Sequence, residues 1–547
     1  MAGRLSLITA LVLGIALLLC AGRPLPAQEP GMAAHALPAL FQTSDRCIAC
    51  HTDLNAPAGL DVSIGPDWRA SMMANAARDP YWQAAVRREV MDHPEASDEI
   101  QNECSICHMP MARYTAVSAG GTGRVFEHLP IGTGDAPLDA LAADGVSCTV
   151  CHQIRPDGLG EEESFVGGFV IDTAVPWGRR EIFGPFAVDS GRTRVMRSAS
   201  EFQPARAEHL KSSELCASCH TLYTHSRGAD GEVIARLPEQ MPYLEWRHSD
   251  FRDERSCQDC HMPVVEDSVA ITGVLGQPRP DVSRHVFRGG NFFMLRMLGR
   301  YRAELGVTAQ PAELELAAQR TIENLQRRTA RLSVADLRLA DGRLEADVVV
   351  ENLAGHKLPT AYPSRRAWLH VTVRDGNGAA VFESGALDGG ARIVGNDNDS
   401  DPERYEPHHA TITRPDDVQI YEAVMVGPED EVTTGLLTAV RYAKDNRILP
   451  RGFDPATASE DIAVQGRARD DRDFVGGEDR IRYVVAVDET DGPFTVEVEL
   501  WYQPIAYRWA RNLADYEAFE TRRFLRYYES MSKGSAVKLA GSTATTR

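Results

Sequence analysis

The pattern Cys-x-x-Cys-His occurs five times in this chain, and the first copy reads Cys47-Ile48-Ala49-Cys50-His51. The ten cysteines of the five copies are Cys47, Cys50, Cys104, Cys107, Cys148, Cys151, Cys216, Cys219, Cys257 and Cys260. The histidines that close them are His51, His108, His152, His220 and His261. The 547-residue sequence has 11 cysteines, so this pattern leaves only Cys20 unused. Such complete use of the cysteines is no accident, and it decides the architecture of the region that carries it.

The spacing within each copy suits a porphyrin. Two thiols three positions apart lie about one helical turn apart, so they can bond to the two vinyl groups of one ring. The adjacent imidazole can then bind the iron as its proximal ligand. Cys-x-x-Cys-His is therefore the attachment signature of c-type haem, and the sequence predicts five covalently attached haem c groups.

Other uses of paired cysteines fit poorly. Zinc ribbons usually hold their two Cys-x-x-Cys halves about 15–20 residues apart, closer than the copies here, and they need no histidine after each pair. A disulfide framework is typical of shorter secreted chains, and redox-active Cys-x-x-Cys pairs do not come in fives.

The amino terminus has the pattern of an export signal. Arg4 precedes an apolar run over residues 5–19, and a Gly/Pro-containing stretch follows. The run is shorter than a typical membrane span, so we interpret residues 1–27 as a secretory signal cleaved after Ala27. Cys20 falls in this segment, and the bulky Leu19 before it disfavours lipid attachment. Because covalent haem attachment requires export, we expect a periplasmic or extracellular protein.

The charge balance limits the partners. The chain has 78 acidic and 58 basic residues, a net charge of −20. This argues against nucleic acid or anionic lipid as a partner. No other stretch is apolar and long enough to span a membrane, so we expect no stable membrane insertion after signal cleavage. Redox proteins are the expected partners, and the sequence leaves the oligomeric state undecided.

The residue pattern changes along the chain. Residues 28–290 hold every motif and are punctuated by Gly and Pro, which predicts short helices around the porphyrins. The clearest helix begins at Asp79-Pro80 and ends near Asp92. Residues 291–330 have apolar residues at helical spacing and predict a helical connector.

Residues 331–505 contain short segments with partial apolar/polar alternation, separated by turn signals such as Asp341-Gly342. They predict an antiparallel β-sandwich. Residues 506–547 return to a helical pattern and predict a C-terminal helix and tail. The predicted fold class is α+β and multidomain: a mostly α and irregular multihaem cytochrome c domain, then the sandwich and the helix.

A resemblance to a known family rests on residues around the motifs. Besides the five copies, Asp144-Gly145-Val146-Ser147 leads into Cys148, and Glu245-Trp246-Arg247 precedes Cys257. In these features the chain resembles multihaem c-type cytochromes, especially the branch around the tetrahaem electron acceptor of hydroxylamine oxidoreductase. The resemblance covers residues 40–290 and implies electron transfer through closely packed haems. In that family W-x-x-S-x-H commonly ends on a distal ligand, but Met73 and Phe251 stand at the matching positions here.

The second axial site of each iron decides its chemistry. Two histidines make a closed electron-transfer centre, methionine raises the potential, and an empty site can bind substrate. The sequence around each histidine ranks the candidate distal ligands. His209 and His285 come first, His93 and His128 come next, and His225 and His248 are weaker. We interpret His35 as a residue of the terminus that is not a ligand. For a fifth site Met73 and His356 compete with vacancy, and we prefer His356 because Gly355 can bring it close to a porphyrin.

Two further sets of charged residues invite hypotheses. Arg365 and Arg366 could pair with haem propionates, since guanidinium binds carboxylate bidentately. Asp397, Asp399 and Asp401 are similar to the start of a calcium loop, but Pro402 replaces the required glycine and His408 the closing glutamate. Calcium is therefore the less favoured interpretation of these aspartates.

Two kinds of function remain. We favour an electron carrier in a respiratory chain, with the sandwich docking a partner or shielding the haems. The alternative is a multihaem reductase or oxidoreductase that acts on a small nitrogen or sulfur compound at one open iron. Pentahaem nitrite reductases typically carry one Cys-x-x-Cys-Lys site, which this chain lacks, so whether the protein is an enzyme stays undecided, with the carrier preferred. A filament-forming cytochrome is a third idea.

Overall fold

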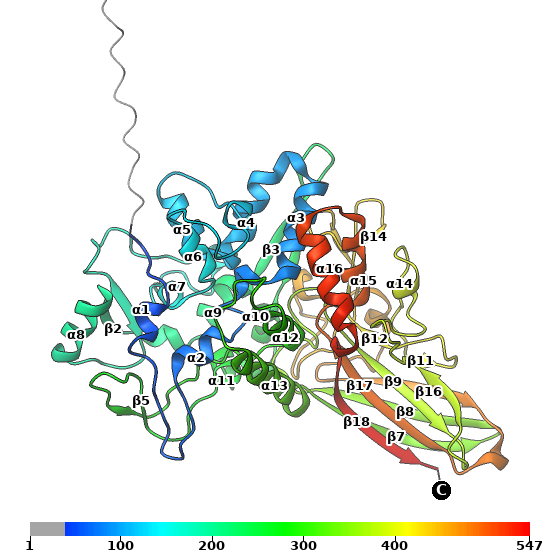
Figure 1. Ribbon diagram of the computed structural model, residues 1–547. Helices are drawn as coiled ribbons and strands as arrows, with labels where there is room; N and C mark the ends of the chain where they lie inside the picture. The colour runs from blue at the N-terminus through cyan, green and yellow to red at the C-terminus, as the bar shows by residue number, and fades with distance from the viewer. Residues whose placement is uncertain (1–38, 547) are drawn as a thin grey trace, which may run out of the picture. The chain divides into compact units, whose positions relative to one another are not determined.

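The structure is a computed structural model that describes residues 39–546 (Figure 1). The predicted signal at residues 1–27, with Cys20, and also His35 lie outside the described residues. The described residues form one compact unit. It contains both helices and sheets, as the predicted α+β class requires.

The motif-bearing part is built of short helices and two-stranded sheets. Its helices are α1 Asp45–Ile48, α2 Ile64–Arg69, α3 Pro80–Asp92, α4 Ser97–His108, α5 Pro110–Ser118, α6 Asp139–Ala143, α7 Cys148–Cys151, α8 Ser190–Ser200, α9 Ser213–His220, α10 Pro242–Arg247 and α11 Cys257–His261. Its strands pair two by two: β1 Glu181–Gly184 with β2 Gln203–Arg206, β3 Leu222–Arg227 with β4 Val233–Gln240, and β5 Val269–Ala270 with β6 Pro278–Arg279.

Helix α3 shows how local chemistry sets an element. The Asp79 carboxylate accepts hydrogen bonds from the N–H groups of Tyr81 and Trp82 at 2.8 and 3.2 Å, and Pro80 occupies the first turn. These groups satisfy donors that a helix start leaves unpaired. The predicted start and end of this helix are confirmed.

Two helices follow the motif region: α12 Phe292–Arg300 and α13 Pro311–Arg328. They pack against each other (Figure 1). Leu314, Ala318 and Leu325 are buried one or two turns apart on α13, the spacing of an amphipathic helix. Both helices lie within residues 291–330.

Two main sheets form a β-sandwich between residues 330 and 545. One has the order β10–β9–β17–β18, with β12 also paired to β9, and the other has the order β11–β16–β8–β7. Their strands are β7 Ala330–Ala340, β8 Arg343–Asn352, β9 Arg366–Arg374, β10 Ala380–Ser384, β11 Thr411–Ile412, β12 Ile420–Tyr421, β16 Glu478–Ala486, β17 Thr495–Gln503 and β18 Val537–Thr545. Alternate residues of β8, β9, β16 and β17 are buried in a shared core.

A smaller sheet joins β13 Ala423–Val426 to β14 Val432–Thr433 and β15 Arg441–Asp445. The pairing is antiparallel except between β11 and β16 in the sandwich and between β1 and β2. The turn between β7 and β8 uses Asp341 and Gly342 at φ of 53° and 71°, the left-handed conformation that the Asp-Gly pair predicted.

The C-terminal segment differs from the expectation. Helices α15 Tyr507–Arg511 and α16 Phe519–Met531 are present, but β18 then adds a strand to the sandwich beside β17. The tail is not merely an extension of the helix, because an edge strand was available for pairing. Phe519 stands in the first turn of α16 and is 59% exposed, so it faces away from the core.

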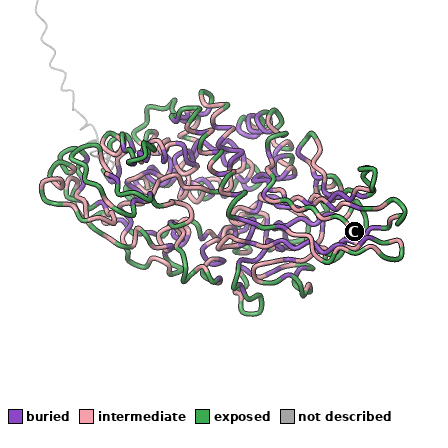
Figure 2. The backbone as a smooth tube through the Cα atoms, turned by 90° about the horizontal axis from the view of Figure 1, so that it is seen from below, coloured by how far each residue is buried: buried purple, intermediate pink, exposed green. Residues whose placement is uncertain are grey.

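The motif-bearing part and the sandwich share one hydrophobic core. Tyr81 of α3 packs against Phe524 of α16 with ring centres 5.1 Å apart, and Tyr362 of the sandwich contacts Tyr81 at 5.9 Å. Figure 2 shows buried backbone running through both parts. None of the helices within residues 39–546 is long and apolar enough to cross a membrane.

Candidate haem-binding sites

Each Cys-x-x-Cys-His motif lies on a short helix or at its end, namely on α1, α4, α7, α9 and α11. Helix α11 is fixed at its start by a capping box between Ser256 and Asp259. Because residues three apart share a helix face, the two thiols of a motif point the same way. All ten motif cysteines are free thiols of intermediate exposure, as covalent attachment requires.

The motif histidines are oriented by the backbone. The Nδ1–H of His51 donates to the carbonyl of Ile271 at 2.5 Å, and that of His108 donates to Ala76 at 2.9 Å. The Nδ1–H of His152 donates to Phe183 at 2.6 Å. His261 makes the same kind of bond to the carbonyl of Arg288. The acceptors all come from other segments, so the fold fixes each ring and leaves its Nε2 for a metal.

His220 differs from the other four. Among the described residues, the His220 ring makes no such hydrogen bond to the backbone, and burial together with the nearby Arg365 guanidinium lowers its pKa. Burial lowers the pKa of all five motif histidines, and that of His108 and His261 falls to about 4. A neutral imidazole is the form that binds a metal.

Thiols of different motifs lie side by side. The neighbouring Cys148 thiol lowers the pKa of Cys47, so the first and third motifs are neighbours. Similar contacts join Cys107 to Cys219 and Cys216 to Cys257. The second and fifth motifs therefore both adjoin the fourth. The Cys219 thiol raises the pKa of Cys151, and the Cys151 thiol raises the pKa of Cys216. The third motif therefore adjoins the fourth and connects the first motif to the others.

Two predicted distal histidines face motif histidines. The rings of His152 and His285 have centres 6.2 Å apart with 18° between their planes. The rings of His261 and His356 have centres 6.3 Å apart with 24° between their planes. The Nδ1 of His285 is buried without a hydrogen-bond partner, which fits a metal ligand better than a structural histidine.

The sandwich residue His356 is held by buried charges. Its Nδ1–H donates to the carbonyl of Lys357 at 2.9 Å. Lys357 in turn donates its N–H to Glu245 of α10 at 3.1 Å and its ammonium to Asp445 at 2.7 Å. Arg447 pairs with both carboxylates, at 3.0 Å to Glu245 and 2.7 Å to Asp445. This network ties the His356 loop to the motif-bearing part, and no pattern in the sequence predicts it.

The other predicted distal residues face no motif imidazole in comparable geometry. The Nε2 of His209 lies 2.8 Å from the carbonyl of Ile154, although its charge still influences His152. His93 is buried with Nε2 3.5 Å from the Thr438 hydroxyl. The Nδ1–H of His128 donates to Asp139 at 2.6 Å. The roles of these three residues as ligands stay predictions.

The weaker candidates are placed as follows. His225 lies 3.9 Å from Glu103 and is 45% exposed, and the Nε2 of His248 lies 3.0 Å from the Asp454 carbonyl. Met73 is half-buried, and its carbonyl accepts a hydrogen bond from the Val146 N–H at 3.0 Å, just before the third motif.

The two arginines predicted near propionates separate. Arg366 is wrong for that role, because its buried guanidinium forms a bidentate pair with Asp399 at 2.8 and 2.9 Å. Arg365 donates to the Thr360 carbonyl at 3.1 Å and lies close enough to His220 and His356 to lower the pKa of both. It stays a candidate for propionate binding.

The calcium hypothesis is also wrong. Asp399 is used by Arg366 and by the N–H of Ile393, while Asp397 pairs with Arg404 at 2.6 Å. These carboxylates therefore bind protein groups. The notional calcium loop is a short helix, α14 Asp397–Ser400, and not a ligand cradle.

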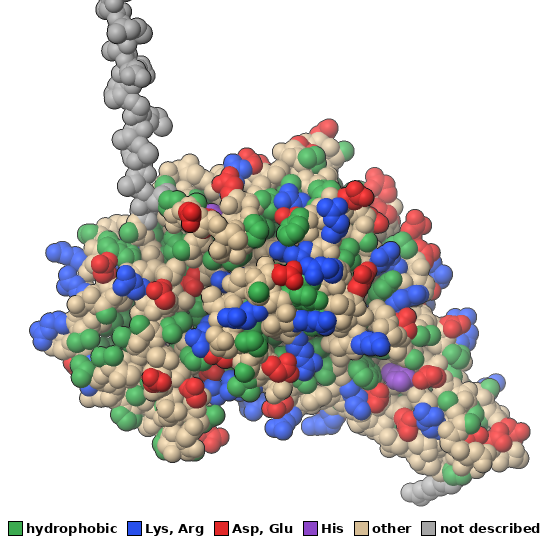
Figure 3. All heavy atoms as spheres, viewed as in Figure 1, with side chains coloured by type: hydrophobic (Ala, Val, Ile, Leu, Met, Phe, Trp, Pro, Cys, Tyr) green, Lys and Arg blue, Asp and Glu red, His purple; other side chains and the backbone are tan. Residues whose placement is uncertain are grey.

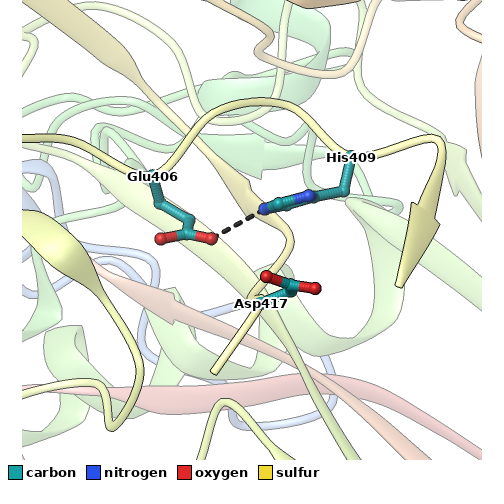
Figure 4. A group of neighbouring side chains, drawn as sticks. All are labelled: Glu406, His409 and Asp417. Carbon is teal, nitrogen blue, oxygen red and sulfur yellow. Dashed lines mark hydrogen bonds and ion pairs between the residues drawn. The ribbon is translucent and has the colours of Figure 1, made fainter. Parts of the chain in front are cut away.

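A compact cluster in the sandwich joins Glu406, His409 and Asp417. Figure 4 shows the three side chains pointing toward one another, with the His409 Nε2–H donating to Glu406 at 2.7 Å. Their donor types would suit a divalent cation. However, Arg414 pairs with the Asp417 carboxylate through two nitrogens, the closer at 2.6 Å, so the cluster is balanced by a cation of the protein itself.

Comparison with known proteins gives one structural likeness. No protein-family model matches the chain, and no curated protein has a matching sequence. The penta-heme cytochrome c552 from Thermochromatium tepidum has a similar structure, with a TM-score of 0.53 and 15% sequence identity. The match covers 93% of this chain and 100% of that chain, so it includes the motif-bearing part and the sandwich alike. The chain therefore shares its overall fold with that penta-heme cytochrome structure.

Proposed function

We propose that this protein is an extracytoplasmic pentahaem c-type cytochrome that transfers electrons between redox partners in a respiratory chain. The observation that carries the proposal is the facing geometry of His152 with His285 and of His261 with His356. A metal–imidazole bond is about 2 Å long, so two imidazoles on opposite sides of one ion have ring centres roughly 6 Å apart. The two pairs have this spacing and nearly parallel rings.

The donor set fits haem c at every motif. The ten cysteines supply paired thiols on helices, and the five motif histidines supply neutral imidazoles, four of them oriented by backbone carbonyls. When bound, haem c supplies a one-electron iron couple whose potential depends on its axial ligands. The chain's own part is to anchor the ring, hold both imidazoles and exclude water from the irons.

The order of contact among the motifs supports a carrier. Neighbouring thiols join the first motif to the third and the fourth motif to the second and fifth, with Cys151 close to the fourth. Attachment sites that adjoin in this way would bring five redox groups into one connected set, branched at the fourth motif. Such a set suits the passage of electrons from one protein partner to another, as the resemblance to the electron acceptor of hydroxylamine oxidoreductase also implies.

Haem stoichiometry and spin state test the proposal. A pyridine haemochrome assay on the exported, matured protein should give five haems per chain. The double variant Cys257→Ala/Cys260→Ala should give four, which identifies one attachment site and serves as the matched comparison. Paramagnetic resonance should show low-spin irons at the His152 and His261 sites. Four or fewer haems in the natural protein, or no bis-histidine signal, would overturn it.

A second candidate function is a reductase or oxidoreductase of a small nitrogen or sulfur compound. It is favoured by one observation: within residues 39–546, no second imidazole faces His51, His108 or His220 as His285 and His356 face their partners. Trp82 lies parallel to the His108 ring instead, with centres 4.2 Å apart. A high-spin fraction in the natural protein that binds carbon monoxide and nitrite would favour this candidate, while a fully low-spin protein inert to both would favour the carrier.

A further inference from the structure

Four arginines gather between the motif region and the helical connector. This arginine cluster consists of Arg284 and Arg288, in the loop after β6, and Arg320 and Arg328 of α13. Figure 3 shows Lys and Arg side chains gathered on the face over α12 and α13. Arg284 forms a bidentate pair with Asp67 of α2, both distances being 2.8 Å, and Arg320 reaches the same carboxylate at 3.1 Å.

The cluster holds more positive charge than its carboxylates offset. Arg284 and Arg320 also lower the pKa of Asp61, so two carboxylates stand among four guanidinium groups. No ion pair of Arg288 or Arg328 occurs among the described residues. Like charges brought together out of water repel unless an anion joins them.

Arg288 is the member that most clearly lacks a partner. Its Nε is buried and makes no hydrogen bond. Burial and the charges of the other three arginines lower the pKa of its guanidinium. A buried nitrogen donor without an acceptor is costly, so this Nε calls for an acceptor that the described residues do not supply.

The location of Arg288 indicates which anion this is. Its N–H donates to the carbonyl of His261 at 3.0 Å, and its own carbonyl accepts from the Nδ1–H of the same histidine. The carboxylates that belong beside a haem-ligating histidine are the propionates of the porphyrin.

We propose that Arg288 binds a propionate carboxylate of the haem held by Cys257, Cys260 and His261, with the arginine cluster supplying the surrounding positive field. This rests on the proposed haem attachment at the fifth motif. Guanidinium presents a planar fork that matches a carboxylate, so Arg288 would both hold the porphyrin edge and stabilise the reduced iron electrostatically. The role is that of a positioning and potential-setting residue.

Spectroelectrochemical titration of the pentahaem protein tests this. Arg288→Gln should retain five haems but lower the midpoint potential of one transition, because removing a positive charge favours the oxidised iron. We expect about a tenfold change in that reduction equilibrium, equal to about 59 mV for one electron. Arg288→Lys should shift it less, since the charge remains. Arg331→Gln, which removes an exposed arginine paired with Glu351 on the sandwich, is the matched control and should shift nothing.

The transition is assigned to the fifth motif if it is also the one altered in His356→Ala. If Arg288→Gln does not mature, Arg328→Gln removes an exposed member of the same cluster. It should lower the same midpoint potential, with a change of at least twofold in the reduction equilibrium constant. Five haems with all potentials unchanged would overturn the inference while leaving the proposed function intact. Fewer than five haems in the natural protein would instead count against the proposed function. A potential that responds to added phosphate at constant ionic strength would assign the site to a solution anion and overturn propionate binding.

Discussion

The imidazoles of His261 and His356 lie 6.3 Å apart between ring centres, although one closes the last haem motif and the other lies in a loop of the β-sandwich. The sandwich is therefore not merely appended to the motif-bearing part. Its loop after β8 reaches the last motif, and the buried charges of Glu245, Lys357 and Arg447 hold it there. We expect axial ligation and the packing of the two parts to depend on each other.

Removing either facing histidine should open one iron. His285→Ala and His356→Ala should each convert one low-spin haem to high spin, because one axial position loses its imidazole. Optical spectra and paramagnetic resonance should show the conversion, and each variant should bind carbon monoxide at one iron.

His370→Ala is the matched control for this experiment. His370 also lies in the sandwich, on β9, but its Nε2 contacts Glu383 at 3.0 Å and it faces no motif histidine. Its spectrum should equal that of the natural protein. If both His285→Ala and His356→Ala keep all irons low-spin and ignore carbon monoxide, the ligand assignment is wrong.

Breaking the buried charge network should release the His356 loop. Glu245→Gln removes a buried partner of Arg447 and weakens the acceptor of the Lys357 N–H. Loss of one member of a buried ion pair costs about 3 kcal/mol or more. Chemical unfolding should show this loss, and part of the fifth-motif haem should become high-spin.

An exposed ion pair gives the comparison for Glu245→Gln. Glu254 is 50% exposed in its pair with Arg451. Glu254→Gln should therefore lower the free energy of unfolding by less than about 1 kcal/mol. The spin state should not change in that variant. Equal effects of the two substitutions would show that the Glu245 network does not position His356.

Gly355 allows the His356 loop to approach α10. A Cβ added at Gly355 would lie 3.2 Å from Phe251 and 3.3 Å from Trp246, tighter than ordinary contact. Gly355→Ala should therefore destabilise the protein by about 1–3 kcal/mol and broaden the low-spin signal of the fifth-motif haem. Gly389→Ala, where nothing lies within 4 Å of the new Cβ, should leave unfolding and spectra unchanged.

Local signals in the sequence predicted most of the elements. Asp79 followed by Pro80 places the start of α3 because a cap and a proline act within one turn. Asp341-Gly342 predicts the turn between β7 and β8 because both residues accept positive φ. The five attachment motifs were readable for the same reason, since the chemistry needs only five consecutive positions.

Relationships between distant segments could not be predicted in this way. The sequence ranked His285 and His356 as ligands but did not say which motif histidine each one faces. The carbonyls that orient the motif histidines, such as Ile271 for His51, belong to irregular loops whose paths no pattern specifies. Arg366 shows the same limit, because its pairing with Asp399 depends on how the sandwich loops fold.

The buried carboxyl of Glu239 should make stability depend on pH. Glu239 lies on β4, and burial raises its pKa to about 7, while Cys104 and Cys107 of the second motif lie close enough to feel its charge. Because the folded state holds this proton more tightly than the unfolded state, its contribution is fully present below the unfolded pKa. That contribution is lost as pH rises from about 4.3 to the folded pKa.

Glu239→Gln should therefore flatten part of the pH dependence of unfolding. Relative to the natural protein, the variant should gain up to about 3 kcal/mol between acid pH and pH 8, since the cost of ionising the buried carboxyl is removed. Urea unfolding at a series of pH values measures this. Glu232→Gln, an exposed change in the same hairpin, should leave the profile parallel to that of the natural protein. A Glu239→Gln profile that also runs parallel, with no relative gain toward pH 8, would show that this carboxyl ionises at its ordinary pKa.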